Sequence, residues 1–274
     1  MDRKRVALVT GASAGIGRAA ALALSKRGWI VYGAARRSSL LEELAPQGVR
    51  PVVLDVTQSL ARQAAIERIR QEEGRLEALV NNAGYGSFGS LEEVPLEEAR
   101  RQLEVNLLAV AGLIQEVLPL MRQQGGGRIV NLSSVAGQIY APLGGWYFAS
   151  KHALEGLSDS LRLELKGQNI KVSLIEPGII RSQWSDLALD SLQRYSGSGP
   201  YAGVCQRTLK FFRWMYASPW SSTPETIARV IVRALESKYP KARYAAPLDA
   251  KLMLILKKYL PDWAFELAVR ALTT

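Results

Sequence analysis

Short apolar runs alternate with helical patterns along most of this chain, and this alternation constrains its fold more than any other feature. The runs that predict β-strands are residues 6–9, 30–34, 51–54, 78–80, 128–132, 171–175 and 244–246. Apolar residues at helical spacing predict helices at 19–27, 61–73, 97–122, 147–165 and 224–237. Strands that alternate with helices favour βαβ units, and strands that are apolar throughout are typical of a parallel sheet covered on both faces. We therefore expect an α/β fold in which a doubly wound parallel sheet lies between two layers of helices.

The 274 residues are predicted to form a single domain, residues 1–274, because no internal repeat or low-complexity linker divides them. Two segments fall outside the alternation. Residues 183–222 are predicted to be a long, irregular substrate lid, since long insertions in compact domains often act as lids. Residues 249–274 are predicted to be a helical C-terminal extension, broken by Pro261. The predicted lid is rich in aromatic residues, which are Trp184, Tyr195, Tyr201, Phe211, Phe212, Trp214, Tyr216 and Trp220.

Charge and cysteine content restrict the classes of function. The net charge is +10, which a nucleic acid, an anionic membrane or a phosphorylated cofactor can each explain. The basic residues are scattered, with no run longer than Arg3-Lys4-Arg5, so we expect mainly solvated surface charge and no nucleic-acid partner. The single cysteine, Cys205, allows no intrachain disulfide and suits a reducing compartment. Neither a signal peptide nor a spanning helix is predicted, and we expect a cytoplasmic protein without a metal site.

A glycine-rich turn follows the first predicted strand. It reads Thr10-Gly11-Ala12-Ser13-Ala14-Gly15-Ile16-Gly17 and leads into a helix. Glycines let the backbone approach a pyrophosphate closely, and a helix N-terminus supplies free N–H groups and a partial positive charge. A simple tight turn is the alternative, but the position at the first strand–helix junction favours a dinucleotide site. The expected cofactor contacts are Gly11, Ser13, Ala14, Gly15, Ile16 and Gly17.

The end of the second predicted strand indicates which dinucleotide is bound. An acidic residue there would accept hydrogen bonds from the ribose hydroxyls of NAD and repel a 2′-phosphate. The sequence instead has Ala35 followed by Arg36 and Arg37, and a guanidinium can pair a phosphate bidentately. Two ordinary surface arginines are the alternative. We expect NADP(H), with Ser13 as a further contact to the same phosphate.

A series of further motifs follows in a fixed order. They are Asp55-Val56, Asn81-Asn82-Ala83-Gly84, Asn106, Ser134, Tyr147-x-x-x-Lys151 and Pro177-Gly178. Together with the glycine-rich turn, they make residues 6–182 resemble the short-chain dehydrogenase/reductase family in its single-domain branch. The resemblance implies a Rossmann fold and an enzyme that transfers a hydride between NADP(H) and a carbonyl or a primary or secondary alcohol. It assigns the catalytic roles to Asn106, Ser134, Tyr147 and Lys151.

The chemistry of Tyr147 and Lys151 agrees with that assignment. The two residues are four apart on a predicted helix and therefore share a face. A phenol is a poor base at neutral pH, but a nearby ammonium favours the phenolate and so brings Tyr147 closer to a useful acid–base range. Ser134 resembles the hydroxyl that binds the substrate oxygen, and Ser133 is its neighbouring alternative. The family role of Asn106 is to hold a water that links Lys151 to solvent, and the alternative is a polar residue at a helix irregularity.

The resemblance also implies cofactor contacts outside the glycine-rich turn. Asp55 is expected to accept a hydrogen bond from the adenine amino group, with Val56 alongside, and Lys151 is expected to bond the nicotinamide ribose. The remaining contacts, which line the adenosine ribose or border the nicotinamide, are Asn82, Ala83, Gly84, Tyr147, Pro177, Gly178, Ile180 and Ser182. The only histidine, His152, adjoins Lys151 but points about 100° away on the helix, so we give it no catalytic role.

The predicted substrate pocket is bounded by residues 84–88, 135–146 and 183–222. Tyr140, Leu143, Trp146 and Trp184 are expected to line it, which favours a bulky apolar alcohol or ketone. Core or dimer contacts are the alternative for about half of these aromatics. The stretch 147–165 and the helical extension resemble those of steroid- and retinol-dehydrogenase-like members, which implies a steroid, retinoid or lipid-like substrate.

Two questions about partners and function stay open in the sequence. The extension mixes Lys251, Lys257 and Lys258 with apolar residues, so a weak peripheral membrane contact is possible beside packing on the domain or on a second subunit. Family members usually form oligomers, and we expect a homodimer. The alternative to an enzyme is a non-catalytic NADPH-binding redox sensor on the same fold.

Overall fold

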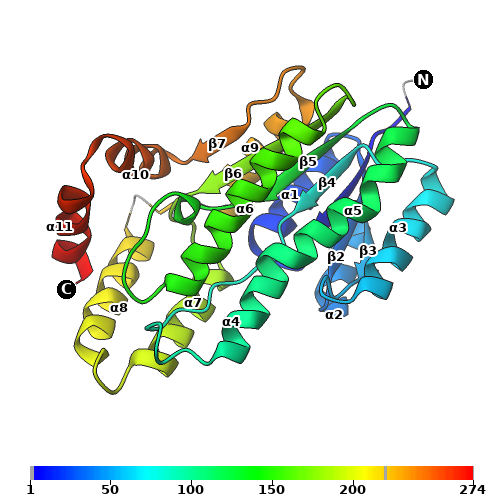
Figure 1. Ribbon diagram of the computed structural model, residues 1–274. Coiled ribbons are helices and arrows are strands. Elements are labelled where there is room, and N and C mark those ends of the chain that lie inside the picture. Colours follow the sequence, from blue (N-terminus) through cyan, green and yellow to red (C-terminus); the bar gives the residue numbers. More distant parts are fainter. Residues whose placement is uncertain (1–2, 219–220, 274) are drawn as a thin grey trace.

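The fold is a seven-stranded parallel sheet with helices on both faces (Figure 1). The computed structural model describes residues 3–218 and 221–273, so Trp220 and Thr274 lie outside the described residues. The strands are β1 (Val6–Thr10), β2 (Ile30–Ala35), β3 (Val49–Val53), β4 (Ala78–Asn81), β5 (Gly127–Leu132), β6 (Ile170–Pro177) and β7 (Arg243–Ala246). They lie in the order β3-β2-β1-β4-β5-β6-β7. The predicted doubly wound, three-layer Rossmann fold is confirmed.

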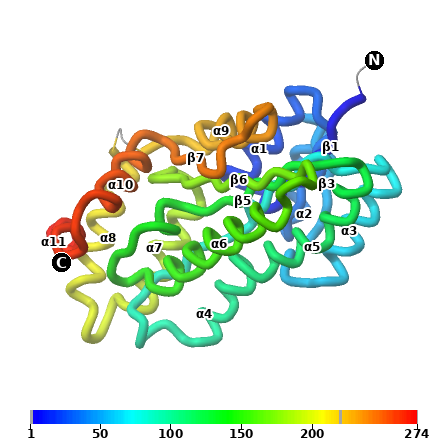
Figure 2. The backbone as a smooth tube through the Cα atoms, turned by 45° about the horizontal axis from the view of Figure 1, so that its top comes forward, coloured from blue at the N-terminus to red at the C-terminus, as the bar shows by residue number. Residues whose placement is uncertain are grey.

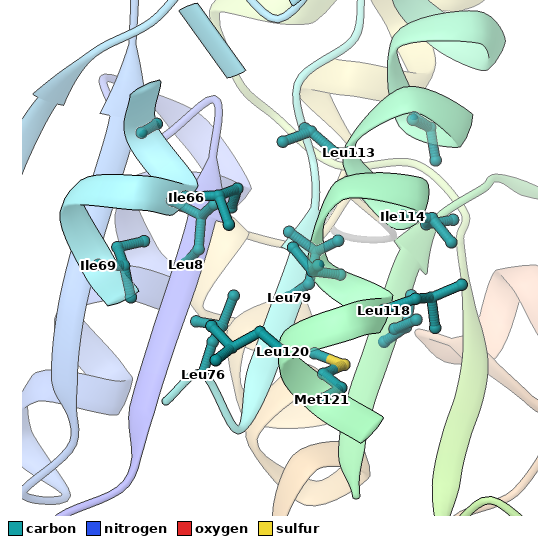
Figure 3. Packing of buried hydrophobic residues seen from close by; sticks show 14 of the residues in the cluster. Leu8, Ile66, Ile69, Leu76, Leu79, Leu113, Ile114, Leu118, Leu120 and Met121 are labelled. Atoms are coloured by element: carbon teal, nitrogen blue, oxygen red, sulfur yellow. The ribbon is translucent and has the colours of Figure 1, made fainter. Parts of the chain in front are cut away.

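Two hydrophobic cores hold the layers together, one on each face of the sheet. Successive side chains of a strand point to opposite faces. Leu8 of β1 therefore belongs to the core beneath α3 (Ser59–Glu73), α5 (Ala109–Gln123) and α6 (Gly145–Glu164), part of which Figure 3 shows. The next residue, Val9, belongs to the core beneath α1 (Gly15–Lys26) and α9 (Pro224–Glu236). This burial on both faces explains why the strands are apolar throughout.

The predicted helix at 97–122 consists of three parts. Helix α4 (Leu96–Leu103) runs through a π-helical turn, η2 (Glu104–Leu108), into α5. The stretch Leu96–Gln123 has the length and hydropathy of a membrane span. However, Leu113 and Val117 of α5 are buried in the sheet core, as expected of a core helix in a globular protein. A short helix, α2 (Ser38–Glu42), and two 3₁₀ turns, η1 (Ala45–Gln47) and η3 (Val135–Gly137), were not predicted.

The predicted lid is not irregular. It contains two helices, α7 (Gln183–Ser196) and α8 (Ala202–Ala217), which pack against each other. The aromatic and apolar residues of this segment follow helical spacing closely enough to bury Leu192, Cys205 and Leu209 together. The C-terminal extension forms α10 (Leu248–Tyr259) and α11 (Asp262–Thr273), and α11 packs on α8. Figure 2 shows α7, α8, α10 and α11 together at one end of the molecule.

Strand order fixes the position of the site. The chain runs from β1 outward to β2 and β3, and then returns to β4 on the other side of β1. In open parallel sheets, ligands bind beyond the carboxyl ends of the strands at such a reversal. Here the ends of β1, β4 and β5 carry Thr10, Asn81 and Leu132. The helices of the lid lie beyond that same edge (Figure 1).

Candidate active site

The turn between β1 and α1 has the shape of a phosphate-binding site. Gly11 and Gly15 adopt positive φ angles of 67° and 53°, which side chains rarely tolerate. A Cβ atom at Gly11 would lie 2.6 Å from Nδ2 of Asn82, so glycine is required there for packing as well. Helix α1 has no side-chain cap and no acidic residue in its first turn. Its N-terminus therefore faces the cleft with the partial positive charge that a pyrophosphate needs.

Thr10 and Asn82 fasten this turn to the neighbouring strand. The Thr10 hydroxyl accepts hydrogen bonds from the backbone N–H groups of Asn82 and Ala83, both at 3.0 Å. The Asn82 amide donates in return to the Thr10 carbonyl at 2.9 Å. Asn82 was predicted only as a ribose contact, and Thr10 had no predicted role. The signal that was missed is a hydroxyl at the last position of a strand, directly before the glycine-rich turn.

The predicted phosphate contacts lie together at the end of the cleft next to β2. Arg36, Arg37 and Ser13 all line it. Two nitrogens of Arg37, Nη2 and Nε, donate to the Ser13 hydroxyl at 3.0 and 3.3 Å. Burial acts to raise the pKa of Asp55, but hydrogen bonds from Thr57 and the charge of Arg36 outweigh it and lower that pKa. An ionised Asp55 is suited to accept a hydrogen bond from an amino group.

Tyr147 and Lys151 lie together, buried, in the wall of the cleft. Their relative exposures are 6% and 7%, and the Lys151 ammonium lies 5.9 Å from the centre of the Tyr147 ring. Lys151 donates to the Leu132 carbonyl at the end of β5 at 2.7 Å, which fixes its position. Burial raises the pKa of Tyr147 to about 12, against the opposing effect of the Ser134 hydroxyl, so the lowering expected from Lys151 is not seen. Burial lowers the pKa of Lys151 to about 8, against the charge of Glu155.

The two adjacent serines after β5 have different partners. Ser134 is the N-cap of η3, where its hydroxyl accepts from the Ala136 N–H at 3.1 Å, and it acts on Tyr147. Ser133 instead acts on Glu155, whose pKa its hydroxyl lowers against the effect of burial. The geometry therefore favours Ser134 over Ser133 as the hydroxyl that acts together with Tyr147.

Asn106 lies in the π-helical turn and is 1% exposed. Its Oδ1 accepts from the Tyr85 N–H at 3.1 Å, and its Nδ2 donates to the Tyr85 carbonyl at 2.9 Å. The same Nδ2 donates to the Ser150 hydroxyl at 3.2 Å, and Ser150 in turn donates to the Tyr147 carbonyl. The side chain thus ties the loop after β4 to the helix that carries Tyr147. The water relay remains a prediction, because these contacts do not test it.

A cleft of about 1180 Å³ connects the glycine-rich turn with the lid. Most of the predicted contacts line it, including Tyr140 and Trp184. Trp184 and Phe88 each have a ring centre 5.3 Å from that of Tyr147. The lid and the extension contribute large apolar side chains to its lining, among them Leu187, Phe211, Phe212, Tyr216, Met253, Leu256, Leu260, Phe265, Val269 and Leu272, and also polar ones such as Asp190, Ser191 and Arg194.

Four predicted contacts do not line the cleft. Leu143 has a φ of 62° and turns its side chain into the cluster of Leu192, Cys205 and Leu209 beneath the lid. Trp146 precedes Tyr147 on α6 and so points to a different side of the helix. Gly17 lies behind the turn, where a Cβ would collide with Asn82 and Gly11, and Ser182 is the N-cap of α7. Leu143 is therefore a packing residue rather than a pocket residue, and Trp146 lies outside the cleft lining.

The extension closes the far side of the cleft, which the sequence left undecided. The ring of Phe265 on α11 lies 5.3 Å from that of Tyr140, edge to face. Lys257 bonds Asp262 at 2.6 Å across the bend between α10 and α11, and its ammonium lies 4.7 Å from the centre of the Tyr140 ring. Packing on the domain is therefore the observed arrangement of the extension.

Comparison with known proteins agrees with this geometry. Residues 5–190 match the family described as short chain dehydrogenase. The chain belongs to the short-chain dehydrogenase/reductase family. A probable short-chain type dehydrogenase/reductase, VdlC, of Helicobacter pylori is 38% identical over 96% of this chain and 97% of its own. A 3-ketodihydrosphingosine reductase of Bacteroides thetaiotaomicron is 36% identical, with 97% of each chain covered. A short-chain dehydrogenase structure from Streptomyces avermitilis has a TM-score of 0.82 at 32% identity, covering 98% of this chain and 94% of its own.

As a short-chain dehydrogenase/reductase, the protein is an oxidoreductase of a family that uses NAD(P)(H). The residues present fit such a cofactor. The glycine-rich turn leaves a cradle that a Cβ at Gly11 or Gly17 would disturb, and the N-terminus of α1 faces it. Among the described residues, no group of His, Cys, Asp and Glu is arranged to hold a metal ion.

Proposed function

We propose that this protein transfers a hydride between NADP(H) and a carbonyl compound or a secondary or primary alcohol. The observation that carries the proposal is the buried arrangement of Tyr147, Lys151 and Ser134 in the wall of one cleft, next to a glycine-rich phosphate site. A buried phenol beside an ammonium is a group that can give and take a proton, and burial makes its charge interactions strong.

The roles of the residues follow from their positions. The glycine-rich turn would hold the dinucleotide, which would supply or accept the hydride when bound. In the reductive direction Tyr147 donates its proton to the substrate oxygen, and in the oxidative direction it removes the proton from the hydroxyl. Ser134 donates a hydrogen bond to the same oxygen and so shares the charge that develops there. Lys151 stabilises the Tyr147 phenolate and binds a ribose hydroxyl.

Preference for NADP(H) over NAD(H) rests on the end of β2. No acidic side chain follows Ala35, and both Arg36 and Arg37 line the adenosine end of the cleft. The hydrogen bond from Arg37 to Ser13 brings a cation and a hydroxyl together at this end of the cleft, which supports a contact to a 2′-phosphate. One relative, 35% identical, is named NADPH-dependent 3-dehydrocapnine reductase, from Ornithobacterium rhinotracheale.

The substrate proposed is bulky and apolar. Aromatic and aliphatic side chains from five helices meet at the substrate end of the cleft, including Trp184, Phe212, Met253 and Phe265. Such walls bind apolar groups and leave the polar Tyr147 to fix orientation. The names of relatives support lipid- or steroid-like ketones: a 3-ketodihydrosphingosine reductase, and a rat 17-beta-hydroxysteroid dehydrogenase type 6 at 32% identity.

The proposal also covers compartment, oligomeric state and membrane contact. We propose a cytoplasmic homodimer with a weak peripheral membrane contact through α10 and α11. The alternative function, an NADPH-binding redox sensor, needs the glycine-rich turn but has no use for a buried proton donor. The intact set of Asn106, Ser134, Tyr147 and Lys151 supports the enzyme.

The decisive experiment is an activity screen of the purified protein. Long-chain amino ketones, steroid ketones, retinal and short aliphatic ketones are each offered with NADPH and with NADH, and nicotinamide oxidation is followed. We expect turnover of at least one apolar ketone, faster with NADPH. Tight binding of NADPH without turnover of any carbonyl would favour the sensor and contradict the enzyme.

A further inference from the structure

Helices α10 and α11 expose large apolar side chains over their outer surface. We call the set Leu252, Ile255, Tyr259, Trp263, Leu267 and Leu272 the C-terminal apolar face, and each is about half exposed or more. Tyr259 and Trp263, at the bend between the helices, are 74% and 71% exposed. Exposed apolar side chains elsewhere in the described residues, such as Leu60 and Leu163, are scattered over distant elements. Figure 1 shows α10 and α11 projecting from one end of the molecule.

The exposed charges next to this face are mostly basic, and the acidic exceptions on α11, Asp262 and Glu266, pair with Lys257 and Arg270. Helix α8, on which α11 packs, exposes Arg207, Lys210 and Arg213 and has no acidic residue. Trp214, on the same helix, is 60% exposed. On α10, Lys251 and Lys258 are exposed among the apolar residues. Apolar and aromatic side chains interspersed with lysine and arginine are suited to the headgroup region of an anionic bilayer.

Residues of the same two helices also line the cleft. Leu256, Leu260 and Leu272 line the cleft and belong to α10, its C-cap and α11. Leu256 and Leu272 are also 52% and 54% exposed. These two leucines thus line the pocket and remain accessible to solvent. An apolar molecule that leaves a bilayer at this face would meet leucine side chains from the surface to the pocket.

A second copy of this chain is a poorer occupant than a bilayer. Two copies that met through this face would bring α8 and its basic residues toward the same residues of the other copy. Like charges brought together in this way repel. The net charge of +10 favours approach to an anionic surface.

We propose that the C-terminal apolar face docks on an anionic lipid bilayer and that the apolar substrate enters the cleft directly from it. The first half stands on exposure and charge alone. The second half rests on the proposed function, because it needs an apolar substrate. Tyr259, Trp263 and Leu267 enter the headgroup–acyl boundary, while Lys258 and Lys210 face the anionic headgroups.

Vesicle flotation of the full chain tests the docking without any turnover. The probes are vesicles of phosphatidylcholine alone and of phosphatidylcholine mixed with phosphatidylglycerol. We expect flotation with the mixed vesicles and little with phosphatidylcholine alone. The variant Trp263→Glu/Leu267→Glu should bind at least about tenfold more weakly, since two apolar side chains lose their burial. Lys210→Glu/Lys258→Glu should weaken binding to the mixed vesicles only.

A matched control carries the same substitution on exposed leucines elsewhere. Leu60→Glu/Leu163→Glu changes α3 and α6, far from the face, and should float like the unmodified protein. Failure of the unmodified protein to float with anionic vesicles overturns the proposal, as does equal loss of flotation in the control. A mass measurement in solution that shows dimers lost only in Trp263→Glu/Leu267→Glu, without vesicle binding, would assign the face to a second copy.

A rate measurement separates substrate entry from docking. With an active ketone from the screen embedded in anionic vesicles, Trp263→Glu/Leu267→Glu should lower the rate several-fold. With a short, water-soluble ketone the same variant should keep its rate. Equal loss with both ketones overturns entry from the bilayer. A protein that floats but turns over no ketone would refute the proposed function and leave docking intact.

Discussion

The two walls of the cleft are built in different ways. The wall at the sheet is formed by strand ends and buried helix faces, where Thr10, Asn82 and Lys151 are fixed by short hydrogen bonds to backbone atoms of neighbouring elements. The wall at the lid comes from α7, α8, α10 and α11, which meet through side-chain packing and leave many apolar residues exposed. The core of the fold therefore fixes the reacting atoms, while the helices outside the sheet decide what reaches them.

Removal of the phenol at the sheet wall should have the largest effect. In Tyr147→Phe the ring still packs against Trp184 and Phe88, but the proton donor is lost, and a general acid of this kind contributes roughly 10²- to 10⁴-fold. We expect kcat to fall by about 10³-fold for every ketone that is turned over. NADPH affinity, measured by fluorescence titration, should change little. Unchanged turnover would refute the role of Tyr147.

The phosphate preference should depend on Arg36. A hydrogen bond to a charged group contributes about 1.5–3 kcal/mol, so Arg36→Ala should weaken NADPH binding roughly ten- to hundred-fold. Binding of NADH should remain the same, because NADH has no 2′-phosphate. Titration of both cofactors against the variant checks this. Equal affinities for NADPH and NADH in the unmodified protein would contradict the preference itself.

The sequence predicted the sheet wall far better than the lid wall. The sequence predicts the conformation of the glycine-rich turn, the strands and the Tyr147-x-x-x-Lys151 helix, because neighbouring residues in the chain determine it. Gly11 needs a positive φ, and Tyr147 and Lys151 share a helix face at any helix position. Short-range rules are sufficient for such features.

The lid wall depends on contacts between residues far apart in the chain. Phe265 meets Tyr140 only because α11 returns across the cleft, and no local pattern indicates that return. Leu143 was expected in the pocket, but its positive φ directs it into the cluster beneath α7 and α8. Asn106 hydrogen-bonds the Tyr85 backbone because a π-helical turn interrupts the helix there. Such positions follow from packing rather than from spacing.

A substitution of Trp184 should distinguish the contribution of the lid wall from that of the sheet wall. Its ring contacts both Phe88 and Tyr147, and it lies at the start of α7. Loss of a buried side chain of this size from a binding surface costs about 1.5–3 kcal/mol, so Trp184→Ala should raise KM for a bulky apolar ketone roughly tenfold or more. For a short ketone, which does not reach the lid, kcat/KM should change much less. An equal loss for both ketones would mean that Trp184 supports Tyr147 rather than the substrate.

The smallest expected effect concerns a carboxylate behind the sheet wall. Glu155 follows Lys151 by one helical turn, is 6% exposed, and pairs with Arg243 at 2.9 Å. Arg243 also pairs with Asp159 and Glu176. Burial raises the pKa of Glu155, against opposing effects of Ser133 and Arg243. The carboxylate of Glu155 in turn raises the pKa of Lys151, which burial has lowered to about 8.

The substitution Glu155→Gln removes that charge, so the pKa of Lys151 should fall further. Lys151 then loses its proton at a lower pH, and the alkaline limb of the ketone-reduction rate should move to lower pH. A shift of about 0.5 pH unit, or about 0.7 kcal/mol, is expected. Glu176, whose pKa is about 7, is already mostly ionised where this limb begins. The control Asp159→Asn, which alters the same Arg243 but not the Lys151 charge, should leave the limb in place. A limb that moves equally in both variants would assign the effect to Arg243 and the packing around it.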